Sequence, residues 1–434
     1  MIVQRDLLLS IKPFIKRDEF ISIVGPRQAG KTTFLEILKK YLNEELGVKE
    51  QLIQFITFED RRLLMEFETS PVDFINSYIP KNIVEKSYLL IDEFQYAQNG
   101  GQKLKLIYDT IKNVKIIITG SSSLDIKANV GRFMVGRIVN FYLHPFHFGE
   151  YLRAGNERLE RMYYENNSRI KSYIFNGKKF EIQNKHDFMY EELIKEYEMF
   201  SVWGGYPAVV LSETEVEKRK ILAEIYNNYI LKDIKTLLEL ATEKNLFLLS
   251  QYLAAQVGNI VSYQNLSQTS GLDFRNLKKH LNILYETYIC SEVRPFFRNK
   301  LKELTKNPKI YFLDMGFRNN LLENMKGLEK RPDAGAVVEN TTFILLNLLF
   351  EGMNKINFWR AKAGAEVDFI LNVGDAIVPV EVKYSLFGEV RLSRSLISFI
   401  ESYKPERALI LTKNFWGTLK RGGTHILFAP VYYL

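Results

Sequence analysis

The sequence has little cysteine and no long apolar run. Cys290 is the only cysteine in 434 residues, so an internal disulfide is excluded and we expect a reducing cytoplasmic setting. The longest apolar run, FILLNLLF at 343–350, is far shorter than the about 20 residues that span a bilayer. The opening MIVQRDLLLSIKPF breaks its apolar run with charges, which disfavours a signal peptide. We therefore expect no membrane partner.

Histidine is also scarce, and acidic residues are fewer than basic ones. His144 and His147 have a metal-like spacing, but no other His or Cys cluster supports them, so we expect a structural role. Lys plus Arg is 59 against 51 for Asp plus Glu, a net charge of +8. This excess favours an anionic partner such as nucleic acid, although a merely basic cytosolic protein fits the charge equally well. The length exceeds one ordinary core and predicts several domains.

A glycine-rich loop follows the apolar run 20–24 and precedes a helical pattern that starts near residue 31. Its spacing G-x-x-x-x-G-K-[ST] is typical of a phosphate-binding loop between a strand and a helix. We expect Lys31 to reach the outer phosphates and Thr32 to hold Mg²⁺, with ATP as the nucleotide. A chance glycine turn is the alternative. The predicted nucleotide contacts are Gly25, Pro26, Arg27, Gln28, Ala29, Gly30, Lys31, Thr32 and Thr33.

An acidic pair follows a second apolar run in SYLLIDEF, residues 87–94. The run Tyr88–Ile91 predicts a strand buried on both faces. Asp92 is then placed to complete the magnesium shell, and Glu93 to orient and deprotonate the attacking water. The pair indicates hydrolysis rather than binding alone. An exposed acidic turn is the alternative.

Two further apolar runs, 52–60 and 114–123, predict strands of the same sheet. The second ends in small hydroxyl residues. Thr119 or Ser121 is therefore a candidate polar sensor beside the γ-phosphate.

Arginine follows glycine twice before a fifth apolar run, at Arg132 and Arg137. An arginine here could stabilise transition-state charge in its own site or in that of a neighbouring copy, and we favour Arg137. The second option would require a homo-oligomer. A plain surface charge is the alternative, and the sequence leaves the oligomeric state open.

These motifs together resemble the AAA+ superfamily. More narrowly, the runs GPRQAGKT, LLIDEFQ, ITGSSS, GR and LHPF resemble a group of bacterial and archaeal ATPases. The resemblance implies a five-stranded parallel sheet between helices in residues 1–152 and a helical lid in residues 153–245. Within the lid, the polar stretch 166–185 predicts an inserted hairpin or a mobile loop. GGYP at 204–207 predicts a tight turn at a helix start.

Residues 246–325 predict three helices followed by the basic loop 298–309, the organisation of a winged helix. Such a fold presents a helix to a DNA groove. The third helix carries Arg275, Lys278 and Lys279 opposite its apolar face, and these are the predicted nucleic-acid contacts. Two alternatives remain: a protein-contact module, or charges that are simply solvated.

The C-terminal region, residues 330–434, predicts two paired strands at 363–371 and 376–385. Because alternate residues of a strand share a face, Glu366 and Asp368 lie on one face of the first strand. Glu381 and Lys383 likewise share a face of the second.

If the two strands pair, their charged side chains meet. Asp368 and Glu381 become candidate ligands for Mg²⁺ or Mn²⁺, and Lys383 becomes a candidate to activate the nucleophile. Glu339, on the helix VVENTTFILLNLL, is a candidate additional ligand, and Arg360 and Lys362 could hold phosphate. A hairpin with cross-strand ion pairs is the alternative.

The separation D-x(12)-E-x-K resembles the PD-(D/E)XK nuclease superfamily, although no proline precedes Asp368. The resemblance implies an α-β-β-β-α-β core. The whole chain therefore resembles prokaryotic AAA+ ATPases fused to a nuclease-like domain: an α/β protein with a P-loop sheet, helical lid, winged-helix middle and C-terminal α/β domain. We expect a Mg²⁺-dependent ATPase coupled to a DNA-binding or DNA-cleaving module. The rival is an ATP-responsive switch that binds a protein partner and has a dead nuclease fold.

Overall fold

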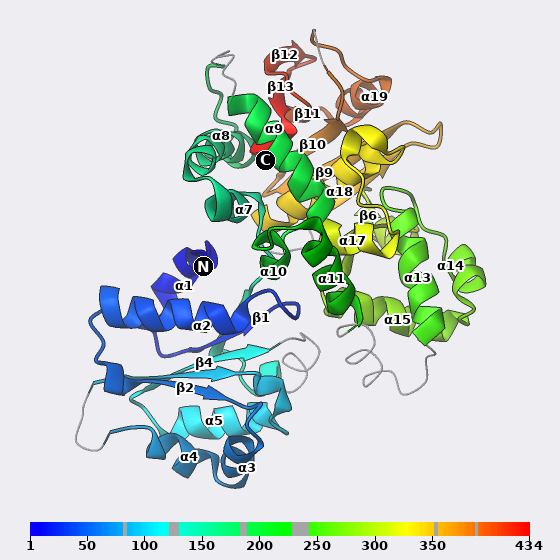
Figure 1. Ribbon diagram of the computed structural model, residues 1–434. Helices are drawn as coiled ribbons and strands as arrows, with labels where there is room; N and C mark the ends of the chain where they lie inside the picture. Colours follow the sequence, from blue (N-terminus) through cyan, green and yellow to red (C-terminus); the bar gives the residue numbers. More distant parts are fainter. Residues whose placement is uncertain (81–84, 121–129, 183–188, 228–242, 351–354, 387–388) are drawn as a thin grey trace. The chain divides into compact units, whose positions relative to one another are not determined.

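The computed structural model describes residues 1–434 except 81–84, 121–129, 183–188, 228–242, 351–354 and 387–388. The chain forms two compact units (Figure 1). The first unit is residues 1–146 with 286–288, and the second is 147–285 with 289–434. None of the helices among the described residues combines the length and the apolar character that a bilayer crossing needs.

The first unit has a five-stranded sheet in which every neighbouring pair is parallel, in the order β2-β3-β4-β1-β5. The parallel sheet expected from the sequence is confirmed. Because all strands run the same way, their carboxyl ends share one edge, where ligands of open α/β sheets bind. The strands are β1 (Phe20–Val24), β2 (Ile53–Thr57), β3 (Ser87–Asp92), β4 (Val114–Gly120) and β5 (Ile138–Tyr142).

Helices cover both faces of this sheet, so its central strands are buried along their whole length and mostly apolar rather than alternating (Figure 1). On one face lie α1 (Leu7–Ile11) and α2 (Lys31–Lys40). On the other lie α3 (Arg61–Thr69), α4 (Pro71–Ser77) and α5 (Gly100–Thr110). Each fully buried Leu or Ile here contributes about 2 kcal/mol of hydrophobic stabilisation. The two packed layers fix the sheet edge that carries the polar residues.

The second unit contains a series of helices as well as the C-terminal sheet. Residues 166–176, predicted as part of a hairpin or mobile loop, instead continue a helix, so that prediction is wrong there. The reason is helical spacing: Tyr163, Ile170 and Tyr173 are buried on one face while the intervening residues are polar. The helices are α7 (Phe148–Gly155), α8 (Glu157–Asn176), α9 (Met189–Trp203), α10 (Pro207–Val210) and α11 (Glu215–Tyr226).

Three helices follow, as expected from the sequence: α13 (Glu243–Ala255), α14 (Tyr263–Ser270) and α15 (Phe274–Glu286). They lead into an antiparallel pair, β6 (Cys290–Pro295) and β7 (Lys309–Phe312), with α16 (Lys300–Thr305) between the strands. Strand β6 also pairs in parallel with β8 (Ile356–Arg360). This pair therefore belongs to the same sheet as the C-terminal strands.

That sheet is mixed and has eight strands, in the order β12-β13-β11-β10-β9-β8-β6-β7. Strands β9 and β10 pair antiparallel, as the sequence predicted, with Val380 opposite Phe369. From α18 onward the elements follow the expected α-β-β-β-α-β order. The remaining elements are α17 (Met315–Leu321), α18 (Ala334–Leu349), β9 (Glu366–Val373), β10 (Ala376–Lys383), α19 (Arg394–Tyr403), β11 (Arg407–Thr412), β12 (Gly417–Arg421) and β13 (Thr424–Pro430).

Candidate functional site

The glycine loop joins β1 to α2 at the carboxyl edge of the first sheet. Gln28 and Gly30 have positive φ angles of 59° and 90°, so the backbone coils between the strand and the helix N-terminus. A Cβ on Gly25 would lie 2.0 Å from the carbonyl oxygen of Leu143, and glycine is therefore required where these chains cross. Such a coil before a helix N-terminus is suited to bind phosphate.

Lys31 is buried at the start of α2. Its Nζ donates to the carbonyl oxygens of Gly25 and Pro26, at 3.0 and 2.9 Å. The ammonium group therefore lies against the loop itself. Binding a phosphate here means exchanging carbonyl contacts for phosphate oxygens, which carry more charge.

Asp92, the last residue of β3, lies between two hydroxyl groups. Thr32 Oγ1 donates to Asp92 Oδ2 at 2.6 Å, and Thr119 Oγ1 donates to Asp92 Oδ1. The structure thus brings together residues from α2, β3 and β4 that are far apart in the sequence. A threonine hydroxyl beside a carboxylate is a donor set that suits Mg²⁺, so these residues fit the ion that the sequence predicted.

Glu93 follows directly, with φ at 54° in the left-handed region, where a non-glycine residue is unusual. Its backbone N–H donates to Thr119 Oγ1 at 3.2 Å, and its carboxylate accepts from Gln95 Nε2. Thr119 therefore contacts both acidic residues. Gln95, which sequence reasoning did not single out, positions the Glu93 carboxylate.

Arg137 lies at the other edge of this sheet. Its carbonyl accepts from Phe20 N at 2.8 Å, at the amino ends of β1 and β5, while the phosphate loop follows the carboxyl end of β1. Its Nε donates to Asp109 Oδ1 at 3.3 Å. Arg137 therefore does not face the loop of its own chain, and only the role in a neighbouring copy remains as a prediction. Arg132 is exposed, and Ser121 lies outside the described residues.

Arg5 is a residue of this site that sequence reasoning missed. Its guanidinium donates to the carbonyl of Ala29 in the phosphate loop at 2.9 Å and to the carbonyl of His144 at 2.6 Å. It also lies 4.8 Å from the ring centroid of Phe146. One buried cation thereby joins the loop to the segment that follows β5. No motif marks a lone arginine in an N-terminal segment, so the sequence held no signal for it.

The predicted nucleic-acid residues all lie exposed on α15, as the expected helix face requires. Arg275, Lys278 and Lys279 point away from the buried Leu277 and Leu281.

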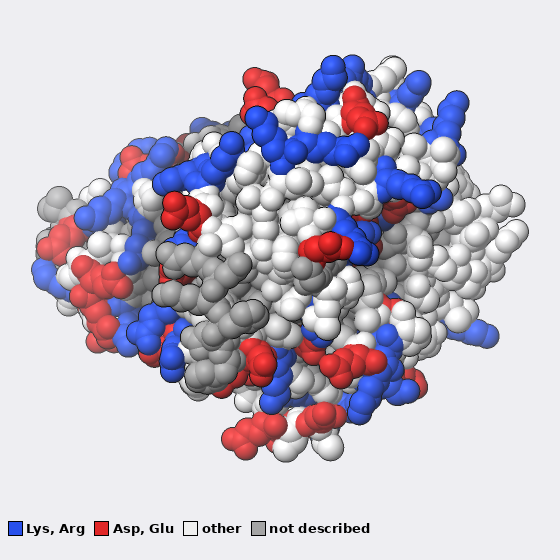
Figure 2. All heavy atoms as spheres, turned by 90° about the horizontal axis from the view of Figure 1, so that it is seen from above, with Lys and Arg blue, Asp and Glu red and all other residues white. Residues whose placement is uncertain are grey.

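Phe274 lies beside these residues. It is 54% exposed, and Lys278 Nζ lies 4.6 Å from its ring centroid. On the face of the molecule in Figure 2, Lys and Arg are interspersed with Asp and Glu rather than gathered in one continuous stripe.

The C-terminal charges also converge, on strands β9 and β10. The backbone N–H of Val382 donates to Asp368 Oδ2 at 2.7 Å. Glu381 accepts from Ser393 Oγ at 2.8 Å and contacts Lys383 Nζ at 3.0 Å. Glu381 and Lys383 therefore lie on the same face of β10.

Strand β7 and helix α18 bring further members to this cluster. Lys309 Nζ lies 3.2 Å from Glu339 Oε1 and 2.5 Å from Glu366 Oε1, and Tyr311 Oη donates to Glu339 at 2.5 Å. Lys309 had been counted as part of a basic loop, but its side chain is only 1% exposed. The sequence offered no signal that separated this lysine from its solvated neighbours.

The cluster shifts the pKa values of its members. Burial, with the charge of Glu339, raises the pKa of Asp368 to about 7, although the Val382 N–H and Lys309 oppose the shift. For Lys309, burial acts to lower the pKa, but Glu339 and Glu366 more than offset it and the net shift is upward. The lysine therefore stays charged at neutral pH.

The metal site predicted at Asp368 and Glu381, with Glu339 as an additional ligand, stays a prediction. Among the described residues, Glu339, Asp368 and Glu381 do not bring their carboxylate oxygens within 4.8 Å of one another. Cationic or hydrogen-bond donor groups contact each of the three carboxylates. Arg360 likewise contacts Glu366, at 3.3 Å, and Lys362 is exposed.

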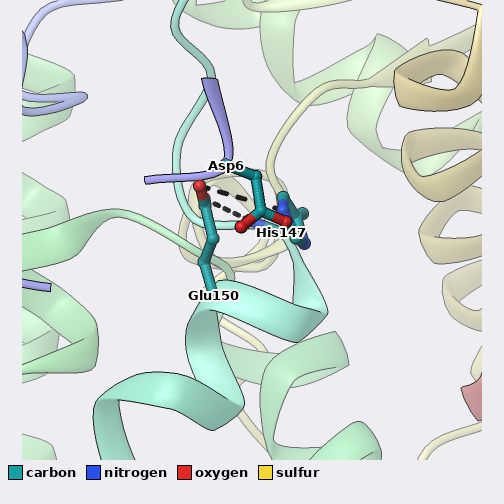
Figure 3. A group of neighbouring side chains, drawn as sticks. All are labelled: Asp6, His147 and Glu150. Carbon is teal, nitrogen blue, oxygen red and sulfur yellow. Dashed lines mark hydrogen bonds and ion pairs between the residues drawn. The ribbon is translucent and has the colours of Figure 1, made fainter. Parts of the chain in front are cut away.

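His147 and Glu150 cap the start of α7 (Figure 3). The backbone N–H of Gly149 donates to His147 Nδ1 at 3.1 Å, and the backbone N–H of His147 donates to Glu150 Oε2 at 3.4 Å. This reciprocal pair satisfies N–H groups at the helix start that would otherwise lack partners. The arrangement agrees with the structural role expected for His147.

Three family models match successive parts of the chain. An AAA domain matches residues 17–152, a domain of unknown function (DUF8612) matches 194–327, and a second one (DUF4143) matches 334–431. The first match and the loop geometry agree, and the first unit has a P-loop ATPase domain.

Two uncharacterized relatives match this chain over most of its length. An uncharacterized protein of Haemophilus influenzae is 24% identical over 438 residues, covering 99% of this chain and 98% of its own. The uncharacterized protein MJ1544 of Methanocaldococcus jannaschii is 24% identical over 409 residues, covering 93% and 82%.

Two solved structures are distantly similar to this chain. The Walker-type ATPase PABY2304 of Pyrococcus abyssi has a TM-score of 0.42 and 16% identity, covering 74% of this chain and 96% of its own. The Aeropyrum pernix ORC1 protein in complex with DNA has a TM-score of 0.32 and 13% identity, covering 74% and 94%.

Proposed function

We propose that this protein is a Mg²⁺-dependent ATP hydrolase whose nucleotide cycle drives a DNA-contacting module in the second unit. The observation that carries the proposal is the position of Asp92, which accepts from Thr32 and Thr119 beside the phosphate loop. The start of α2 and the ends of β3 and β4 thus present side-chain oxygens at one edge of the sheet. This is the position where a parallel α/β sheet binds its ligand.

Each residue of the site has a task in this mechanism. Thr32 and Asp92 would hold Mg²⁺, which neutralises charge on the phosphate oxygens. Lys31 and the loop N–H groups bind the phosphates. Glu93 takes a proton from the attacking water, and Thr119 and Gln95 hold Glu93 in place. A positioned base speeds the attack of water on the phosphate, so turnover is expected to be slow without Glu93.

The DNA-contacting module is supported by the exposed group Arg275, Lys278 and Lys279 on α15. Helix α15 is the third of three successive helices, and the antiparallel pair β6–β7 follows it in the chain, as in a winged helix. The half-exposed Phe274 adds an aromatic face beside the cations.

A second candidate function is an ATP-responsive switch that binds a protein partner and cuts nothing. The observation that favours it is the internal pairing of the C-terminal charges, where Lys383 contacts Glu381 and Lys309 contacts Glu339. A cleaving site would need these carboxylates for metal.

One assay separates the two candidates. The purified protein is mixed with supercoiled plasmid and Mg²⁺ or Mn²⁺, with and without ATP. The release of phosphate and the amount of plasmid bound by the protein are measured. ATP hydrolysis stimulated by bound DNA supports the first candidate. ATP hydrolysis without binding of the plasmid supports the switch. If no ATP is hydrolysed under any of these conditions, both candidates are overturned.

A further inference from the structure

Lys309 is an unusual lysine because its side chain is buried although it lies on β7, the edge strand of the C-terminal sheet. Its side chain is 1% exposed, and its Nζ lies between the carboxylates of Glu339 on α18 and Glu366 on β9. It also lies 5.4 Å from the ring centroid of Phe358. A buried charge of this kind is costly unless its partners are well placed, and here two carboxylates compensate it.

The cluster around Lys309 is close to charge balance without any added ion. The carboxylates are Glu339, Glu366, Asp368 and Glu381, and the cations are Lys309, Arg360 and Lys383. Among the described residues, each of these carboxylates has a cation, a hydroxyl or a backbone N–H as partner. With four carboxylates and three cations the cluster carries a net charge of about −1, and a divalent ion would change it to about +1 unless a resident cation left.

We infer that Lys309 is the resident cation of the C-terminal cluster, and that its ammonium group serves Glu339 and Glu366 in place of a divalent metal ion. The site then takes no Mg²⁺ or Mn²⁺ while Lys309 is present. Tyr311 supports this role because it holds the same Glu339 oxygen that contacts Lys309.

Two consequences follow. The strand that supplies Lys309, β7, belongs to the sequence region predicted as a winged helix, so the cluster cannot be built from residues 330–434 alone. The C-terminal domain is also not a metal-dependent nuclease in its resting arrangement. The inference does not rest on the proposed ATP hydrolysis and can fail without it.

The test uses the full-length, nucleotide-free protein and counts bound Mn²⁺ by electron paramagnetic resonance. Wild type and Asp368→Asn are expected to bind the same number of ions. Lys309→Met keeps a similar shape and removes the charge, so it is expected to bind one more Mn²⁺ and to gain thermal stability on adding it. Lys306→Met, which changes an exposed lysine three residues away, is the matched control and should behave as wild type.

The comparison of wild type with Asp368→Asn decides the matter even if Lys309→Met does not fold. Loss of one bound Mn²⁺ in Asp368→Asn would show that the wild-type cluster already holds metal and would overturn the inference. A folded Lys309→Met protein that gains no Mn²⁺ would overturn it as well. Equal binding in wild type and Asp368→Asn, with a gain in Lys309→Met, supports it.

Discussion

The hydroxyl of Thr32 lies 2.6 Å from Oδ2 of Asp92, although sixty positions separate the two residues. This hydrogen bond joins the start of α2 to the end of β3 and sets the geometry of the predicted magnesium shell. Thr119, on β4, donates to the other carboxylate oxygen of Asp92. Substitutions around this hydrogen bond should therefore affect nucleotide chemistry more than folding.

Glu93→Gln should retain ATP binding and lose at least about 100-fold in turnover, because the amide keeps the shape but removes the base. The measurement is phosphate release together with binding of a fluorescent ATP analogue. Lys31→Ala is the comparison that should lose binding itself. Equal turnover in wild type and Glu93→Gln would remove Glu93 from the role of base.

Arg5→Met should raise the KM for ATP by about 10-fold with a smaller effect on kcat, because the loop carbonyl of Ala29 loses a charged donor. The control is Arg17→Met, since Arg17 is exposed and pairs with Glu19. Steady-state kinetics and a thermal melt are measured on both. A change in melting temperature alone, with unaltered KM, would make Arg5 purely structural.

Arg137→Ala and Lys31→Ala should each be inactive alone and should recover activity when mixed, if Arg137 acts in the site of a neighbouring copy. The recovery arises because a mixed assembly contains sites with an intact loop and an intact arginine. Phosphate release is followed as a function of the mixing ratio. A fully active Arg137→Ala protein would contradict the prediction.

Replacing Arg275, Lys278 and Lys279 by Glu should weaken DNA binding and reduce the slope of log affinity against log salt by about three, one for each lost phosphate contact. Fluorescence anisotropy at several salt concentrations measures this slope. A matched control reverses Lys105, Lys112 and Lys220, three exposed lysines elsewhere in the chain. An equal effect of both triple variants would mean that only net charge matters.

Acid stability should depend on Asp333. Burial acts to raise its pKa, but ion pairs and hydrogen bonds from Arg331 and Arg318 outweigh burial and lower the pKa from 3.8 to about 2. A lowered pKa in the folded state gives stability that is present above the ordinary value and is lost as the pH falls toward 2.

Urea unfolding of wild type and Asp333→Asn at pH values from 2 to 5 measures this contribution. The variant should lose part of the acid dependence and should be less stable at neutral pH, since Arg318 keeps a buried charge. Asp375→Asn, in the exposed turn between β9 and β10, is the control. Identical pH curves for wild type and Asp333→Asn would exclude Asp333 as the source.

The first unit could be predicted in most respects from the sequence. Strands buried on both faces are mostly apolar, and the loop from Gly25 to Thr32 needs glycine where the backbone coils or meets Leu143. Both requirements are local, so they leave patterns in contiguous residues. The helix over 166–176 was missed because polar residues dominate that stretch and its few buried residues contact distant parts of the chain, as Tyr173 does with Ala408.

The sequence by itself determined the residue types at the two candidate sites: the loop with Lys31, the acidic pair after β3, and the charged pairs on β9 and β10. Only the tertiary structure decided which partners these residues have. It placed Arg5 on the loop, Arg137 at the opposite sheet edge, and Lys309 between Glu339 and Glu366. The physical reason is that a charged side chain acts through whatever lies within a few ångströms, and those neighbours come from segments that only folding brings together.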